Sequence, residues 1–353
     1  MNLNKLRKEI DGIDEKITRL LNLRAKVIVR VGELKQKNGS SAYSPDRERQ
    51  VLDRVIRGSK GPLSKGALES IYREIMSSSF SLEKPLKIVY MGPQASFSHL
   101  AALKRFGSQV EYTACDSIGD VFLEVERGGA DYGVVPIENS IEGAVSHTLD
   151  MFMDSDLKIC SQIMLDVAHN LLANCRKDSI KRVYSNPQVF GQCRIWLQEN
   201  LPGAELVEVS STTRAAQIAR KEKNASCIAS ILAATVYKLR VIARDIEDSP
   251  HNITRFLVIG RAAVKQTKRD KTSILFSIKD SVGALHDMLV PFKKYGINLT
   301  KIESRPSKKK AWDYYFFMDL EGHQDSPKVK KALNELEVKC KFLKILGSYP
   351  VGE

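Results

Sequence analysis

Residues 134–145 have the sequence V-V-P-I-E-N-S-I-E-G-A-V, and this stretch decides how the middle of the chain is interpreted. An apolar run leads through Pro136 and is followed at once by the polar residues Glu138, Asn139 and Ser140. A short apolar run of this kind predicts a buried strand. Ligands of α/β proteins bind at the carboxyl ends of strands, so we expect a binding site where this strand ends.

Further short apolar runs alternate with helical patterns on both sides of this stretch. They predict strands near residues 86–91, 162–173, 182–185, 206–209 and 227–229. Alternation of strands and helices is typical of an α/β domain with a largely parallel sheet. We expect this domain to occupy residues 85–262.

The flanking segments predict two domains of other classes. Residues 1–84 contain no strand pattern, and their apolar residues recur in steps of four and three at Leu6, Ile10, Ile13, Ile17, Leu20, Val27, Val31 and Leu34. Ser44-Pro45 predicts the cap and first residue of a second helix, and a third is expected from Leu63 to Leu82. After a basic linker, residues 271–353 read strand, helix, strand, strand, helix, strand, which is the order of a ferredoxin-like α+β domain.

Composition and charge limit the possible functions without choosing among them. The net charge is +13, with 18 Lys and Arg against 11 Asp and Glu in residues 1–84, 20 against 20 in residues 85–267, and 17 against 11 in residues 268–353. Basic ends are compatible with nucleic acid, with small dianionic substrates, or with solubility alone. The six cysteines are scattered without a C-x-x-C pair, which argues against a zinc site or a disulfide framework. The chain lacks the apolar core of a signal peptide and any run of about 20 apolar residues, so we expect a cytoplasmic protein without a membrane partner.

An arginine interrupts the apolar stripe of the first helix. Arg24 occupies a stripe position, and Lys35 lies eleven residues later, ~16 Å along the axis of a helix. These two side chains could converge on one anion. Arg7 lies ~25 Å from Arg24 along the same axis, so it could share that anion only from an antiparallel partner helix in a dimer. The alternative is that Arg24 reaches solvent or pairs with an internal glutamate.

This basic set resembles that of the all-helical chorismate mutases. The resemblance covers almost all of residues 1–84 and rests on Arg7, Arg24, Lys35, Arg47, Glu48, Ser79 and Glu83. It implies a rearrangement of chorismate to prephenate that needs no nucleophile and no cofactor, only a held substrate and stabilised charge. By resemblance, Arg7 from a partner subunit, Arg24, Arg47 and Ser79 contact carboxylates, Glu48 contacts the ring hydroxyl, and the catalytic Lys35 and Glu83 contact the ether oxygen.

The middle domain resembles prephenate dehydratase. The resemblance rests on the 92–98 turn with Ser96 and Ser98, on Glu138-Asn139-Ser140, on Ser185, Gln188 and Gln192, and on Thr254-Arg255 before the last strand. It implies two α/β lobes similar to periplasmic binding proteins, prephenate as substrate, Thr254 as the catalytic residue, and the other residues as prephenate contacts. No metal or organic cofactor is implied. Ala95 and Asn186 depart from the family pattern, and we interpret His99, His147 and His169 as surface or packing residues.

The last segment resembles the phenylalanine-binding ACT domains of these dehydratases. Gly283, Ala284 and Leu285 open a helix, and Glu303-Ser304-Arg305-Pro306 end a strand. The resemblance implies binding of L-phenylalanine by these two motifs and feedback inhibition. The alternative for this domain is a dimerisation unit that has lost its ligand.

The sequence therefore predicts a bifunctional enzyme of phenylalanine biosynthesis that forms a homodimer or a higher homo-oligomer. A rival hypothesis is an amino-acid-sensing regulatory protein without catalysis. The helical segment lacks the short glycine-containing turn between two helices that DNA-reading proteins use, so we expect no nucleic-acid partner.

Overall fold

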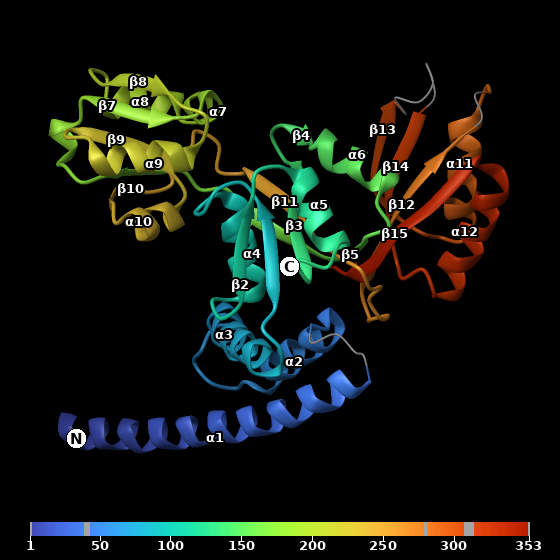
Figure 1. Ribbon diagram of the computed structural model, residues 1–353, viewed down its shortest axis with the longest axis horizontal. Coiled ribbons are helices and arrows are strands. Elements are labelled where there is room, and N and C mark those ends of the chain that lie inside the picture. The colour runs from blue at the N-terminus through green and yellow to red at the C-terminus, as the bar shows by residue number, and fades with distance from the viewer. Residues whose placement is uncertain (1, 39–42, 279–280, 307–313, 352–353) are drawn as a thin grey trace. The chain divides into compact units, whose positions relative to one another are not determined.

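The computed structural model describes residues 2–38, 43–278, 281–306 and 314–351 (Figure 1). The chain divides into two compact units, of which the first comprises residues 1–87 and 106–111 and the second the remainder.

The first unit contains three helices, α1 (Leu3–Lys37), α2 (Pro45–Gly58) and α3 (Lys65–Glu83), as the apolar periodicity predicts. Ser44 precedes α2 as expected, but its hydroxyl bonds to the Asp46 carboxylate and not to a helix amide. Gly32 is the buried residue of α1, and a Cβ placed there would lie 3.0 Å from the Cα of Glu83. Glycine at this position therefore allows the backbones of α1 and α3 to approach closely.

The second unit begins with a lobe built on a mixed sheet. The strand order is β2 (Glu111–Cys115), β1 (Lys87–Met91), β3 (Tyr132–Asn139), β11 (Ile253–Gly260) and β5 (Lys158–Asp166), and β4 (Gly143–Ala144) pairs with the end of β3. The helices of this part of the chain are α4 (Phe97–Phe106), α5 (Ile118–Glu126) and α6 (Ser146–Asp154).

A second lobe has its own sheet, in the order β10 (Arg240–Ala243), β6 (Asn170–Ala173), β9 (Ala225–Ala229), β7 (Arg182–Ser185) and β8 (Glu205–Glu208). Its helices are α7 (Pro187–Gln192), α8 (Arg194–Asn200), α9 (Thr212–Lys221) and α10 (Ile231–Tyr237), with a 3₁₀ turn at Lys177–Ser179.

The prediction of a largely parallel sheet is wrong. Strand β11 runs antiparallel to both β3 and β5, and β6 runs antiparallel to both β9 and β10. The cause is the path of the chain, which leaves the first lobe after β5 and returns as β11 after the whole second lobe. Two connecting segments, residues 167–169 and 244–252, thus join the lobes, and they bond to each other through Val167 N to Asn252 O at 2.7 Å.

The last part of the chain forms the predicted βαββαβ order: β12 (Asp270–Ser277), α11 (Ala284–Lys294), β13 (Leu299–Pro306), β14 (Tyr314–Glu321), α12 (Pro327–Lys339) and β15 (Phe342–Pro350). The strand order β13-β14-β12-β15 is antiparallel throughout.

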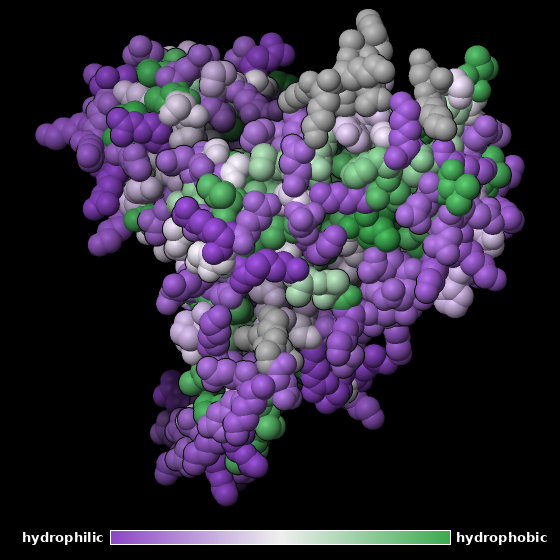
Figure 2. Space-filling view, turned by 45° about the vertical axis from the view of Figure 1, so that its right-hand side comes forward, coloured by the Kyte–Doolittle hydropathy of each residue, from purple (hydrophilic) through white to green (hydrophobic). Residues whose placement is uncertain are grey.

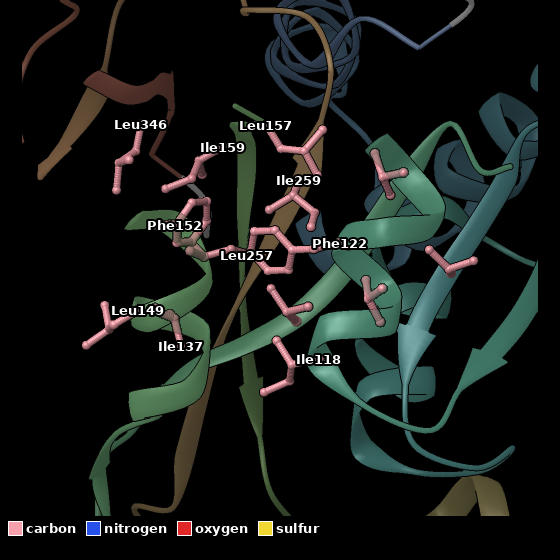
Figure 3. Close-up of a cluster of buried hydrophobic side chains, with 14 of the residues drawn as sticks. Ile118, Phe122, Ile137, Leu149, Phe152, Leu157, Ile159, Leu257, Ile259 and Leu346 are labelled. Atoms are coloured by element: carbon pink, nitrogen blue, oxygen red, sulfur yellow. The ribbon is translucent and has the colours of Figure 1, made fainter. Parts of the chain in front are cut away.

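The ferredoxin-like domain shares a hydrophobic core with the first lobe. Figure 3 shows Leu346 of β15 beside Ile159 of β5, in one buried cluster with Phe122, Phe152 and Leu257. A Cβ at Gly347 would lie 2.3 Å from the carbonyl oxygen of Ile159, so glycine allows β15 to contact the backbone of β5. The two domains are therefore held together by apolar burial, which is the dominant favourable term in such contacts.

Candidate functional site

Helices α1 and α3 bring four of the predicted mutase residues together. Arg24 donates to the hydroxyl of Ser79 and, at 3.5 Å, to the carbonyl of Ile75. Lys35 forms an ion pair with Glu83 at 2.8 Å, and the Glu83 side chain is only 6% exposed. Desolvation by burial lowers the pKa of Arg24 below its ordinary value. The partners of Arg24 on α3 are thus a hydroxyl and a carbonyl, and not a glutamate.

The remaining predicted mutase residues have other recorded partners or are exposed. Glu48 of α2 is buried and pairs with Arg73 of α3 at 2.7 Å. Arg47 is exposed and donates to Gln50, and Arg7 is exposed near the start of α1. Sequence reasoning missed Arg73, because its partner Glu48 lies 25 residues away on another helix and no local pattern marks the pair.

Strands β3 and β11 position the dehydratase motifs by direct pairing. Thr254 is the register partner of Asn139, and Arg255 is the partner of Glu138. Because successive side chains of a strand point to opposite faces, these four residues divide into two pairs on opposite sides of the sheet.

The first pair joins a chain of hydrogen-bonded side chains. Asn139 Nδ2 donates to Thr254 Oγ1 at 2.8 Å and to Asn252 Oδ1 at 2.7 Å. Asn252 Nδ2 donates to Gln192 Oε1 at 3.1 Å, and the same oxygen lies 2.7 Å from His169 Nε2. The structure therefore brings together the predicted residues Asn139, Gln192 and Thr254. It adds Asn252, which was not among the predicted site residues, and His169, which the sequence led us to interpret as a surface or packing residue.

The second pair faces the ferredoxin-like domain. Arg255 Nη1 bonds to Asp319 of β14 at 2.6 Å, and its Nη2 donates to the Tyr349 hydroxyl at 2.9 Å. Glu138 lies 3.0 Å from Lys301 and 3.6 Å from Arg255. Desolvation by burial draws the pKa of Arg255 down, but Tyr349 and Asp319 outweigh it and raise the pKa overall. The structure does not bring Arg255 and Glu138 together with Thr254.

Three predicted serines make backbone contacts. The Ser140 hydroxyl donates to His251 O at 2.7 Å and accepts from Ile253 N at 2.9 Å, which fixes the end of β3 against the start of β11. Ser185 is buried and donates to Ile228 O. Ser96 accepts from the amide of His99 at the start of α4.

The turn before α4 carries the alanine that departs from the family pattern. Ala95 has φ +71°, a left-handed conformation that favours glycine. Two hydrogen bonds hold it there: Ala95 N donates to His99 Nδ1 at 3.1 Å, and the Ser230 hydroxyl donates to Ala95 O at 2.8 Å. Ser98 is buried just behind this turn.

Helix α7 carries the second departure. Asn186 caps this helix by accepting from Val189 N at 2.9 Å, so an N-cap function accounts for its residue type. Gln188 is exposed in the first turn of the same helix.

The two motifs of the ferredoxin-like domain lie on α11 and β13. Gly283 has φ +79° at the N-cap of α11, before Ala284 and Leu285, and no described residue lies within 4 Å of where a Cβ would stand. Glu303, Ser304, Arg305 and Pro306 form the end of edge strand β13. Arg305 lies 3.4 Å from Asp150 of α6.

In the ranges that the structure describes, no three His, Cys, Asp or Glu side chains are arranged to hold a metal ion. Among those same residues, no helix combines the length and hydropathy needed to cross a membrane.

Comparison with known proteins identifies the three parts of the chain. Family models match residues 6–84 as chorismate mutase type II, residues 88–264 as prephenate dehydratase, and residues 272–338 as ACT domain. The prephenate dehydratase of Arthrobacter aurescens, solved in complex with L-Phe, has a TM-score of 0.70 and 32% identity over 75% of this chain and 90% of that one. The predicted fold class is thereby confirmed.

Full-length relatives join the same three parts in one chain. The bifunctional chorismate mutase/prephenate dehydratase of Pseudomonas aeruginosa is 44% identical over 99% of this chain and 97% of its own length. That of Aquifex aeolicus is 52% identical over 353 residues, which cover 99% of this chain and 98% of the relative. This chain belongs to the bifunctional chorismate mutase/prephenate dehydratase family.

Proposed function

We propose that the helical domain rearranges chorismate to prephenate and that the α/β domain converts prephenate to phenylpyruvate. The observation that carries the proposal is the pairing of the Thr254 hydroxyl with Asn139 at the register-matched ends of β3 and β11. It fits the expectation that a binding site forms where the strand that ends at Asn139 stops.

In the helical domain, the cluster between α1 and α3 provides charge for a dianion. Arg24 and Ser79 would hold a carboxylate, and Lys35 would stabilise negative charge on the breaking ether oxygen. Glu83 lies against Lys35 at 2.8 Å, so it would reach the same oxygen. Glu48 would contact the ring hydroxyl, and Arg47 a carboxylate.

A homodimer would complete this site. Along α1, Ile10, Ile13, Ile17, Leu20, Val27 and Leu34 are 47–64% exposed. Hydrophobic residues are visible at the surface of the helical unit, at the bottom of Figure 2. An apolar stripe of this length on one helix is typical of an interface, and an antiparallel copy would carry its Arg7 toward Arg24.

In the α/β domain, Thr254 would donate a hydrogen bond to the departing hydroxyl of prephenate. The bond from the ring to the carboxylate breaks, its electron pair completes the aromatic ring, and the C–O bond to the hydroxyl breaks. Carbon dioxide leaves, and the hydroxide takes one proton from solvent to form water. Ser96, Ser98, Asn139, Ser140, Ser185, Gln188 and Gln192 would line the site. Arg255 and Glu138 stay predictions as prephenate contacts.

The ACT domain is proposed to bind L-phenylalanine and to inhibit the dehydratase. Amide groups at the start of α11, at Gly283, Ala284 and Leu285, would bind the carboxylate, because helix N-termini favour anions. The end of β13, from Glu303 to Pro306, would contact the rest of the ligand. The complex of the Arthrobacter aurescens dehydratase with L-Phe supports this assignment.

Two further assignments complete the proposal. The domain boundaries are 1–84, 85–262 and 271–353, in keeping with the matched ranges. A cytoplasmic location agrees with six unpaired cysteines. A sensor without catalysis is the alternative, and the full-length relatives named as bifunctional enzymes argue against it.

A crossed pair of variants tests the proposal. Chorismate consumption is followed by ultraviolet absorbance, and phenylpyruvate formation from added prephenate by its alkaline absorbance. Arg24→Ala should lower mutase turnover about 100- to 1000-fold and spare the dehydratase. Thr254→Val should lower the dehydratase about 100-fold and spare the mutase. A wild-type chain that acts on neither substrate would refute the proposed function and favour the sensor.

A further inference from the structure

A chain of polar side chains runs from one inter-lobe connection to Thr254. Its members are His169, Gln192, Asn252 and Asn139. His169 lies on the connecting segment 167–169 and Asn252 on the segment 244–252. These segments are bonded to each other twice more, by His169 N to Glu247 Oε2 at 2.8 Å and by Ile246 N to His169 O at 2.9 Å. The chain therefore starts from a fixed part of the backbone.

Two backbone amides fix the direction of every hydrogen bond in this chain. The amides of Ile141 and Glu142 donate to Asn139 Oδ1 at 2.9 and 3.1 Å, so the NH₂ group of Asn139 must face the other way. Both of its hydrogens are used, one on Asn252 Oδ1 and one on Thr254 Oγ1. The Thr254 hydroxyl thus accepts from Asn139, and its own proton is directed to another acceptor.

The same logic continues in the other direction. Because Asn252 Oδ1 accepts from Asn139, Asn252 Nδ2 faces Gln192, and Gln192 must present its oxygen. The Gln192 Nε2 then faces the Glu142 carboxylate at 3.3 Å, which is a donor-to-acceptor contact. His169 must therefore present an N–H at Nε2 to that Gln192 oxygen.

His169 is suited to remain in this single state. It is 1% exposed, and its Nδ1 has no hydrogen-bond partner among the described residues. Desolvation by burial lowers its pKa below the ordinary value, so the ring is neutral near neutral pH. A neutral ring with its hydrogen on Nε2 carries no hydrogen on Nδ1. The unpartnered Nδ1 therefore leaves no buried N–H group without an acceptor.

We infer that His169 and Asn252 are positioning residues of the dehydratase that orient the Thr254 hydroxyl toward the substrate through Gln192 and Asn139. This inference rests on the proposed function of Thr254. The backbone amides set which way the Asn139 amide faces, and Asn252, held in turn by Gln192 and His169, binds its second hydrogen. Without that bond the Asn139 side chain could shift, and the Thr254 proton would lose its defined direction. A misdirected donor lowers the rate of the chemical step more than it lowers binding.

The competing explanation is that His169 only fills space, since its ring lies edge-on to Phe97 with centroids 5.7 Å apart. Two substitutions separate these roles. His169→Phe keeps an aromatic ring and removes the donor, whereas His169→Gln loses the ring and keeps an N–H at a similar distance from the backbone.

The experiment measures kcat and KM for prephenate, with chorismate mutase turnover of the same chains as the internal control. His169→Phe should lower dehydratase kcat about tenfold with a smaller change in KM, and His169→Gln should recover most of it. If His169→Phe is as active as His169→Gln or more active, the ring acts by packing and the inference is overturned.

A second pair of variants tests the other positioning residue and does not depend on whether the His169 variants fold. Asn252→Asp keeps an acceptor for Asn139, whereas Asn252→Leu removes it. The leucine variant should lose about tenfold more kcat than the aspartate variant, and equal losses would overturn the inference. A wild-type chain that makes no phenylpyruvate would refute the proposed function instead, so the two failures are distinguishable.

Discussion

Replacing Asp319 with alanine should destabilise the second unit far more than removing a surface carboxylate does. Asp319 is fully buried, and it bonds to Arg255 Nη1 at 2.6 Å and accepts from the Ser273 hydroxyl. Arg255 is itself only 7% exposed. The alanine variant would leave the guanidinium buried without its main counter-charge.

The size of the effect follows from this burial. Removing one partner of a buried ion pair costs about 3–5 kcal/mol, because the other charge stays desolvated. Glu138 remains 3.6 Å from Arg255 and its side chain is 37% exposed, so it offsets part of the lost counter-charge. We therefore expect the free energy of unfolding to fall by about 3 kcal/mol. At about 2–4 °C for each kcal/mol in a domain of this size, the melting temperature should fall by roughly 6–12 °C.

Calorimetry of the variants beside two controls tests this reasoning. Glu335→Ala removes a partner of Lys294 at nearly the same distance, 2.7 Å, but the Lys294 side chain is 56% exposed and the Glu335 side chain 34% exposed, so the melting temperature should change far less. The double variant Arg255→Met with Asp319→Leu removes both buried charges and should recover much of the loss. If the Asp319→Ala variant melts at a temperature as high as the Glu335→Ala variant does, the argument is refuted.

Three other predictions concern the remaining sites. Glutamine donates a hydrogen bond at every pH and an ionised carboxylate does not, so Glu83→Gln should raise mutase turnover above neutral pH; identical pH profiles would exclude Glu83 from the ether oxygen. Gly283→Val places a β-branched residue at φ +79° and should weaken L-phenylalanine binding in calorimetry without removing basal dehydratase activity. Because burial lowers the pKa of His169, the unfolded chain takes up more protons below about pH 6.5, and native stability falls as pH drops from there; His169→Gln should lessen that fall in the melting temperature.

The helical domain could be predicted closely because its signal is local. An apolar period near 3.6 residues indicates α1 directly, and the gap at Arg24 marks a partly buried cation. The partner of that cation could not be predicted, since Ser79 lies 55 residues away on another helix. Periodicity identifies the apolar face of a helix and does not identify what lies against it.

The dehydratase site could be predicted only in part. Alternation along a strand already implies that Glu138 and Asn139, like Thr254 and Arg255, point to opposite faces. Sequence alone did not reveal that the second face would be covered by the ACT domain, because that contact joins residues 64 and 94 positions apart. His169 and Asn252 carried no local signal, since their roles depend on how two inter-lobe segments meet.

The alternation of β11 places two functions on neighbouring residues. Thr254 points to the polar chain of the proposed site, and Arg255, about 3.3 Å further along the strand, points to Asp319 of the ACT domain. A displacement of β14 relative to β11 would break a 2.6 Å contact and leave a buried charge, at a cost of about 3 kcal/mol. Gly347 adds a second constraint, because it brings β15 against the backbone of β5, the neighbour of β11. A movement of the ACT domain that kept these contacts would carry β11 with it and would change the position of Thr254.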